Sequence, residues 1–186
     1  MFFIFSHKLV QSIIRKYVIH MKNHHFKFLI LSIAIALAVG SISYQLTGDN
    51  YQLYETLKQP PLSPAPIVFP IVWTVLYILM GIATYLFIAT IEQKPVTKMY
   101  DPLPEAKKGL LYYALQLAFN LMWSPVFFRF QFFFPALIIV AILWYFVFQT
   151  YNTYKHLSKT AGLLFLPYII WCTFALYLNF GIVILN

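Results

Sequence analysis

Aromatic and neutral polar side chains recur at helical spacing in three separate stretches of the chain. Residues three or four positions apart lie on the same face of a helix. A face that combines rings with amides can stack a flat ligand and orient it through a few hydrogen bonds. The three stripes are Phe69, Trp73 and Tyr77; Gln116, Asn120 and Trp123; and Pro167, Trp171, Ala175 and Asn179.

We predict that these stripes meet in one ligand pocket. The alternative is packing, because amides join helices within a membrane and Trp and Tyr gather at its interfaces. Each residue taken alone fits packing better, but the repetition on three helices favours a pocket. Trp144 has no such neighbours and fits packing or an interfacial position. The predicted ligand-binding residues are Trp73, Tyr77, Gln116, Asn120, Trp123, Trp171, Ala175 and Asn179.

Other reactive groups suggest no metal site. Cys172 is the single cysteine, so it forms no internal disulfide, and a small buried residue is the simpler interpretation. All five histidines lie near basic residues. His24 and His25 therefore fit a solvated interfacial pair better than a pair of metal ligands. We predict no metal ion and no intrinsic cofactor.

Five long stretches contain no Lys, Arg, Asp or Glu: residues 28–48, 59–91, 109–128, 130–154 and 160–186. Each can hold the ~20 apolar residues of a helix that spans a bilayer. A charge at the bilayer centre costs at least ~2.5–3.5 kcal/mol. We therefore predict an all-α membrane protein, a five-transmembrane-helix bundle. Its helices are expected at about 28–44, 66–91, 106–128, 132–151 and 158–185.

Composition supports this class. Of the 186 residues, 61% are hydrophobic and 10% are charged, whereas soluble domains average about 25% charged residues. Membrane barrel strands alternate polar and apolar residues, and these stretches do not. The composition leaves no room for a separate soluble domain.

The net charge of +8 indicates topology rather than nucleic-acid binding. With five spans, the N-terminus and the second and fourth loops share one side, which holds all but two of the 13 basic residues. The exceptions are Lys58 and Arg129. Basic loops stay inside, so we predict a cytoplasmic N-terminus and an external C-terminus, and no nucleic-acid partner.

Residues 1–27 form a basic N-terminal segment ahead of the membrane domain, residues 28–186. Residues 1–20 fit either an amphipathic helix on the membrane surface or an upstream extension, with Met21 as the start. The extension is slightly favoured. The segment that follows resembles a signal peptide, but its apolar part is long, so we interpret it as a retained helix.

Prolines and one short connection shape the expected bundle. The stretch Pro60–Pro66 predicts a stiff loop, because proline lacks a donor and blocks a helix. Pro125, Pro135 and Pro167 are expected to kink or end their helices. The connection at residues 129–131 is short, so the helices on either side should be antiparallel neighbours. No internal repeat is visible, unlike in inverted-repeat transporters.

Several motifs in order resemble the TspO/translocator protein family, also called tryptophan-rich sensory proteins or peripheral-type benzodiazepine receptors. The resemblance covers residues 57–186 and extends to the first helix. Together the motifs are highly specific, although each alone is weak. They are Leu57-Lys58-Gln59-Pro60-Pro61; Val72-Trp73-Thr74-Val75-Leu76-Tyr77; Ala114-Leu115-Gln116-Leu117 with Asn120 and Trp123; and Leu166-Pro167-Tyr168 with Trp171, Ala175 and Asn179.

The resemblance implies a function. Family members have five membrane helices, are commonly homodimers, and bind porphyrins in a cavity capped by the first loop. It implies that Trp73 and Tyr77, Asn120 and Trp123, and Trp171 and Ala175 line this cavity from three helices, under the lid Pro60–Pro66. Porphyrin or heme would be a ligand, and the partners would be the bilayer and a second copy. Some members bind cholesterol, but the sterol motif is missing from the last helix, so we infer no sterol binding.

Two other departures concern aromatic and acidic positions. Tyr51 and Tyr54 stand where members commonly have a first-loop Trp, and Ile139 stands near an acidic position of helix four. Any acid-dependent step there is therefore in doubt.

Three functions remain open. The first is a receptor or carrier for porphyrins, with a sensory or tetrapyrrole-homeostasis role. The second is a light- and oxygen-dependent porphyrin-degrading enzyme, whose catalytic residues would be Trp73 and Trp171, because indoles can pass electrons. The third, an ion-coupled transporter, is the weakest, because proton relays need intramembrane Asp, Glu or His, and the five charge-free stretches contain none of these residues.

Overall fold

The computed structural model describes residues 25–47, 53–94 and 101–186. Every regular element within those residues is a helix, so the all-α prediction is confirmed there. The predictions made for residues 1–24 lie outside the described residues. The elements are α2 (His25–Thr47), α3 (Leu53–Thr56), α4 (Val68–Gln93), α5 (Leu103–Ser124), the π-helix η3 (Pro125–Arg129), α6 (Phe133–Leu157), α7 (Lys159–Leu163) and α8 (Leu166–Leu185).

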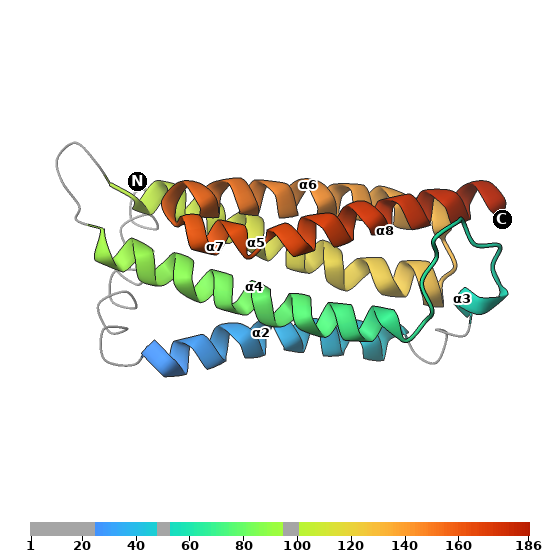
Figure 1. Cartoon of the computed structure of the whole chain (residues 1–186), viewed down its shortest axis with the longest axis horizontal. Coiled ribbons are helices and arrows are strands. Elements are labelled where there is room, and N and C mark those ends of the chain that lie inside the picture. Colours follow the sequence, from blue (N-terminus) through green and yellow to red (C-terminus); the bar gives the residue numbers. More distant parts are fainter. Residues whose placement is uncertain (1–24, 48–52, 95–100) are drawn as a thin grey trace, which may run out of the picture.

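The long helices lie side by side along the long axis of the molecule (Figure 1). α5 packs most extensively against α6, as the short connection between them predicted, and α2 packs against α4 while α8 packs against α6. The short helix α3 and the chain that follows it cover the end of the bundle where α8 finishes (Figure 1). This end is called the lid end, and residues 53–67 are called the lid.

Among the described residues, four helical segments are long and apolar enough to cross a membrane, with mean hydropathy of 2.0 to 2.2: 26–47, 68–93, 133–157 and 159–185. The last of them comprises α7 and α8. The expected fifth span, α5, is not among them. It begins with Glu105, Lys107 and Lys108 and later carries Gln116 and Asn120, which lower its hydropathy. The described residues therefore give an all-helical membrane protein with four such helices, rather than the five predicted.

The lateral surface is consistent with a lipid environment. Large apolar residues on α2, α4, α6 and α8 are exposed, among them Leu31, Ile71, Ile138 and Ile184. Only 11% of the apolar window in α2 is buried inside the protein. A soluble protein rarely exposes apolar surface on this scale, whereas a bilayer covers it.

Prolines set several helix boundaries. The predicted single helix over 158–185 is two helices, because α7 ends before Leu164 and α8 starts again with Pro167 in its first turn. Proline is well tolerated there, where its missing N–H has no helical partner.

α6 continues six residues beyond the predicted end, and its last turn holds Lys155 and His156. Basic groups at this position favour the helix dipole.

Two glycines let α2 approach α4 closely. A Cβ on Gly40 would overlap the ring of Tyr77, and a Cβ on Gly81 would overlap the backbone of Ile33. The ring of Tyr77 therefore lies directly against Gly40 of α2. This contact fixes Tyr77 at the centre of the bundle.

Candidate functional site

A chain of hydrogen bonds joins α4, α5 and α8 in the middle of the bundle. The Tyr77 hydroxyl donates to Asn120 Oδ1. Asn120 Nδ2 donates to the Tyr168 hydroxyl at 2.9 Å, and that hydroxyl donates to Gln116 Oε1 at 2.9 Å. All four side chains are buried. These four residues are called the polar cluster, and they satisfy one another as amides and hydroxyls within a membrane must.

Trp73 covers the polar cluster from α4. Its ring stacks on Tyr77 with centroids 5.7 Å apart and meets the edge of Tyr168 at 5.9 Å. Gln116 Nε2 lies 3.7 Å from the sulfur of Met80 and makes only a weak hydrogen bond with it. The polar cluster is thus enclosed by rings and a thioether.

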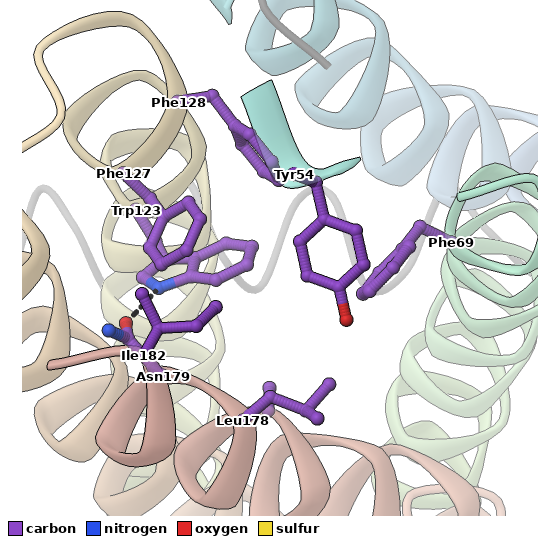
Figure 2. Close-up of a pocket in the computed structure, with 9 residues that line it drawn as sticks. Tyr54, Phe69, Trp123, Phe127, Phe128, Leu178, Asn179 and Ile182 are labelled. Atoms are coloured by element: carbon purple, nitrogen blue, oxygen red, sulfur yellow. Dashed lines mark hydrogen bonds between the residues drawn. The ribbon is translucent and has the colours of Figure 1, made fainter. Parts of the chain in front are cut away.

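A cavity of about 20 Å³ lies nearer the lid end. A volume of this size holds about one water molecule. Figure 2 shows aromatic rings from the lid, α4, α5 and η3 facing apolar residues of α8 across it. Its lining consists of Tyr54, Phe69, Trp123, Phe127, Phe128, Ala175, Leu178, Asn179 and Ile182.

Hydrogen bonds fix one wall of the cavity. The indole N–H of Trp123 donates to Asn179 Oδ1 at 3.1 Å, and Asn179 Nδ2 donates to the carbonyl of Phe133 at 3.1 Å. The bonds tie α5, α8 and α6 together. The amide of Asn179 is therefore used by the protein and positions the Trp123 ring.

The π-helix η3 brings two more rings to the cavity. The N–H of Phe130 donates to the carbonyl of Pro125 at 3.0 Å, which is the i to i+5 pattern of a π-turn. This wider turn places Phe128 over Trp123, and the two rings meet edge to face at 6.1 Å. Helical spacing alone predicted a regular helix to residue 128, in which those two residues would not share a face.

The lid closes the cavity with Tyr54 and is tied to α8. The ring of Tyr54 is 3% exposed and meets Phe69 at 5.1 Å. Asn186 exchanges two hydrogen bonds of 3.0 Å with the backbone N–H and carbonyl of Lys58. The hydroxyl of Tyr177 donates to the carbonyl of Pro61 at 2.8 Å. The lid thus rests on the end of α8.

Two buried donors beside the cavity have no hydrogen-bond partner: the hydroxyl of Tyr54 and the indole N–H of Trp171. Burial raises the pKa of Tyr54, and the nearby Ser63 hydroxyl opposes part of that rise. Ser63 itself donates to the carbonyl of Pro60 at 2.7 Å. Tyr54 is therefore a neutral phenol, able to donate.

The predicted site residues fall into two neighbouring groups. Tyr77, Gln116 and Asn120 belong to the polar cluster, under Trp73. Trp123, Ala175 and Asn179 line the cavity. Trp171 lies beside it, with its ring 5.9 Å from that of Phe69. The three stripes do meet, but the structure engages all three amides in hydrogen bonds within the protein.

Sequence reasoning missed several members of the site. Tyr168 falls outside the step of four on the last helix, although a Tyr in an apolar span needs a hydrogen-bond partner and could have signalled a polar neighbour. Tyr54 was noted only as a replacement for Trp. Phe128 reaches the cavity because of the π-turn, and Pro125 is the one local sign of that turn. Phe127 lies four residues after Trp123, so helical spacing could have found it.

Metal ligands do not converge in the part of the chain that the structure describes, where no group of three His, Cys, Asp or Glu residues occurs. Cys172 is buried in α8. The pair His24 and His25 was proposed as interfacial, and its side chains lie outside what is described. The site therefore offers stacking and hydrogen bonding.

Known proteins resemble the chain over most of its length. The TspO/MBR family pattern matches residues 30–185. Tryptophan-rich protein TspO of Chlorobaculum tepidum is 36% identical over 165 residues, which are 88% of this chain and 99% of that protein. The tryptophan-rich sensory protein of Cereibacter sphaeroides is 39% identical over 72% of this chain and 76% of its own. The translocator protein of Ovis aries is 30% identical over 73% and 75%. The chain therefore belongs to the TspO/MBR family, as the ordered motifs predicted.

Proposed function

We propose that this chain is a membrane receptor or carrier for porphyrins, such as protoporphyrin and heme, and for related hydrophobic aromatic ligands. The observation that supports it best is the cavity lined by rings from three helices and closed by the lid. Ligand sites are concave and mostly apolar, with few polar groups. The proposed role is sensory or in tetrapyrrole homeostasis. A sensory role fits the name of the Cereibacter relative, and a carrier role fits the name of the Ovis aries relative.

Binding a porphyrin requires the lid to move. The cavity of about 20 Å³ is far below the ~300–1,000 Å³ of pockets for drug-sized ligands. The lid is attached to α8 by the bonds of Asn186 and Tyr177, which lie at the exposed end of the bundle. Moving it with Tyr54 opens the space between Phe69 and Trp123. In this proposal ligand binding and lid opening are coupled.

Titration of the detergent-solubilised protein with protoporphyrin tests the proposal. Tryptophan fluorescence should be quenched saturably. The double variant Trp73→Phe and Trp171→Phe should weaken binding, followed by the porphyrin's own absorbance. Trp144→Phe is the matched control, because that indole donates to Thr173 at 2.8 Å on an exposed face. Unchanged affinity in the double variant would show that the site has been misplaced.

We further propose that α5 is the fifth membrane span and that the N-terminus is cytoplasmic. α5 lies between α2 and α6, and Lys108 and Arg129 mark the two ends of its apolar part. Cys172 is buried, so a single added cysteine can report its side. In right-side-out membranes, an impermeant maleimide should label Lys58→Cys and spare Lys108→Cys. The reverse pattern contradicts the orientation.

A homodimer also belongs to this proposal. The exposed apolar faces of the helices can pack against a second copy as well as against lipid. Measuring the mass of the protein within its detergent complex distinguishes a dimer from a monomer.

The second candidate function is light- and oxygen-dependent porphyrin degradation. Trp73 contacts both Tyr77 and Tyr168, so an indole that exchanges an electron with an excited porphyrin has two phenols beside it. In the net reaction the porphyrin is oxidised and oxygen is reduced, and the indole recovers its electron, so that the protein is unchanged. Illuminated protoporphyrin should then yield a defined product only with folded protein. Equal bleaching by denatured protein rejects this candidate.

A further inference from the structure

The two unpartnered donors lie against one ring. Phe69 meets Tyr54 edge to face at 5.1 Å and meets Trp171 in the same way at 5.9 Å. Phe69 and Tyr54 both line the cavity. Figure 2 shows the Tyr54 hydroxyl pointing into the space between Phe69 and Leu178. The donors therefore border the region that lid opening would enlarge.

Unpaired buried donors are uncommon, because burial removes water without replacing its hydrogen bond. The neighbouring amide groups, in contrast, all have hydrogen-bond partners within the protein. Asn120 and Gln116 bond within the polar cluster, and Asn179 bonds to Trp123 and Phe133. Within the described residues Tyr113 also has a buried hydroxyl without a bond, but it lies against Phe165 and is not part of the cavity lining.

We propose that the Trp171 N–H and the Tyr54 hydroxyl select ligands that carry a hydrogen-bond acceptor oxygen, a carboxylate or a carbonyl. The inference rests on the proposed function and names the chemistry that its site recognises. An indole N–H can only donate a hydrogen bond. It therefore stabilises a bound ligand that offers an acceptor oxygen, and forms no hydrogen bond with an alkyl group. A site with an unpaired donor therefore favours a ligand that pairs the donor over one that leaves it unpaired.

Three porphyrins that differ in their acceptor oxygens can distinguish selection by hydrogen bonding from binding by stacking alone. Protoporphyrin carries two carboxylates, its dimethyl ester carries neutral carbonyls, and etioporphyrin has only alkyl groups at its edge. Binding is followed by the shift of the porphyrin Soret band, which does not depend on the protein's tryptophans. The unmodified protein should bind the two oxygen-bearing porphyrins about tenfold more tightly than etioporphyrin, since a hydrogen bond to the ligand is gained.

The variants Trp171→Phe and Tyr54→Phe keep a ring and remove one donor each. Each should weaken binding of protoporphyrin and its ester by about tenfold and leave etioporphyrin binding unchanged. A variant that only disturbed packing would weaken all three porphyrins alike. Trp144→Phe is the matched indole control and Tyr113→Phe the matched phenol control, and neither should change the preference.

The outcomes are distinct. Equal weakening of all three porphyrins, or no weakening, overturns the inference while the proposed function stands. If the unmodified protein binds none of them, the proposed function fails and this inference fails with it. A preference for protoporphyrin over both the ester and etioporphyrin that survives in both variants also overturns it and assigns recognition to a cation such as Lys58.

Discussion

Two aromatic clusters occupy opposite ends of this bundle, and they are built differently. At the lid end, rings surround a cavity and two donors lack partners. At the other end, Phe87 and Tyr154 stack in parallel with centroids 3.8 Å apart, and Phe165 meets Tyr154 edge to face at 5.3 Å. We call Phe87, Tyr154 and Phe165 the closed cluster.

Both ends are rich in aromatic rings, and they differ in how tightly those rings are packed. A Cβ on Gly109, beside the closed cluster, would lie 2.9 Å from the Phe87 ring and 3.1 Å from a Thr153 methyl. The space around Gly109 is therefore filled by neighbouring side chains, as in a well-packed protein interior. At the lid end the rings meet at 5 to 6 Å around Phe69 and leave a void. Tyr113, against Phe165 of the closed cluster, also has an unpaired hydroxyl. Neither rings nor an unpaired donor alone therefore separate the two ends, whereas the void is found among the rings of the lid end.

The largest effect is expected from added volume at the closed cluster. Gly109→Leu should destabilise the protein by about 3 kcal/mol, because overpacking forces rings and backbone apart. The midpoint of thermal unfolding in detergent should fall by about 9 °C. Ala118→Leu, on the exposed side of the same helix, is the control and should change little. An unchanged midpoint for Gly109→Leu would show that this end is not closed.

The next largest effect is expected from removing the hydroxyl of Tyr168, compared with removing that of Tyr54. Tyr168→Phe deletes a group that both accepts from Asn120 and donates to Gln116, so it should cost about 2 kcal/mol and lower the unfolding midpoint by about 6 °C. Tyr54→Phe deletes an unpartnered hydroxyl and should leave the midpoint unchanged. Similar losses for both variants would mean that Tyr54 has a partner in the membrane.

Added volume at the cavity should affect binding more than folding. Ala175→Val extends two methyl groups from a lining position, where a void can take up part of them. We expect the stability to change by less than about 1 kcal/mol and the affinity for protoporphyrin to fall about tenfold. Ala141→Val, on the exposed face of α6, should alter neither. A large loss of stability with unchanged affinity would reverse the comparison between the two ends.

The long helices could be predicted from the sequence, because a charge inside lipid is costly and the helices largely coincide with stretches that contain no charged residue. The three stripes also predicted which helices meet, since i and i+4 residues must share a face. Pro167 was expected to kink or end its helix, and α8 does begin there with Pro167 in its first turn. The exact bounds were wrong, because residues 160–186 form one charge-free stretch and were predicted as one helix. The π-turn at Pro125 escaped prediction because its hydrogen-bond pattern depends on packing against α2 and α6.

Hydrogen-bond assignment within the site was also beyond the sequence. Asn120 and Gln116 were expected to hold a ligand's polar edges, since an amide in lipid needs some partner. Asn120 accepts a hydrogen bond from Tyr77, which spacing did select. The partner that both amides share is Tyr168, which spacing did not select. Conversely, Trp171 was expected to stack, and only the structure reveals that its N–H is unpaired. Spacing predicts neighbours along one helix, but pairing across helices depends on their relative rotation.

The smallest effect concerns the lid, which differs from the closed end in being held by exposed bonds. Asn186→Ala removes both hydrogen bonds to Lys58, and exposed bonds contribute little to global stability. Local opening should nevertheless rise about fivefold, measured as trypsin cleavage after Lys58. Cleavage after Lys159, at the opposite end, is the internal control. If cleavage after Lys58 stays constant while protoporphyrin still binds, ligand reaches the cavity without opening of the lid at Asn186.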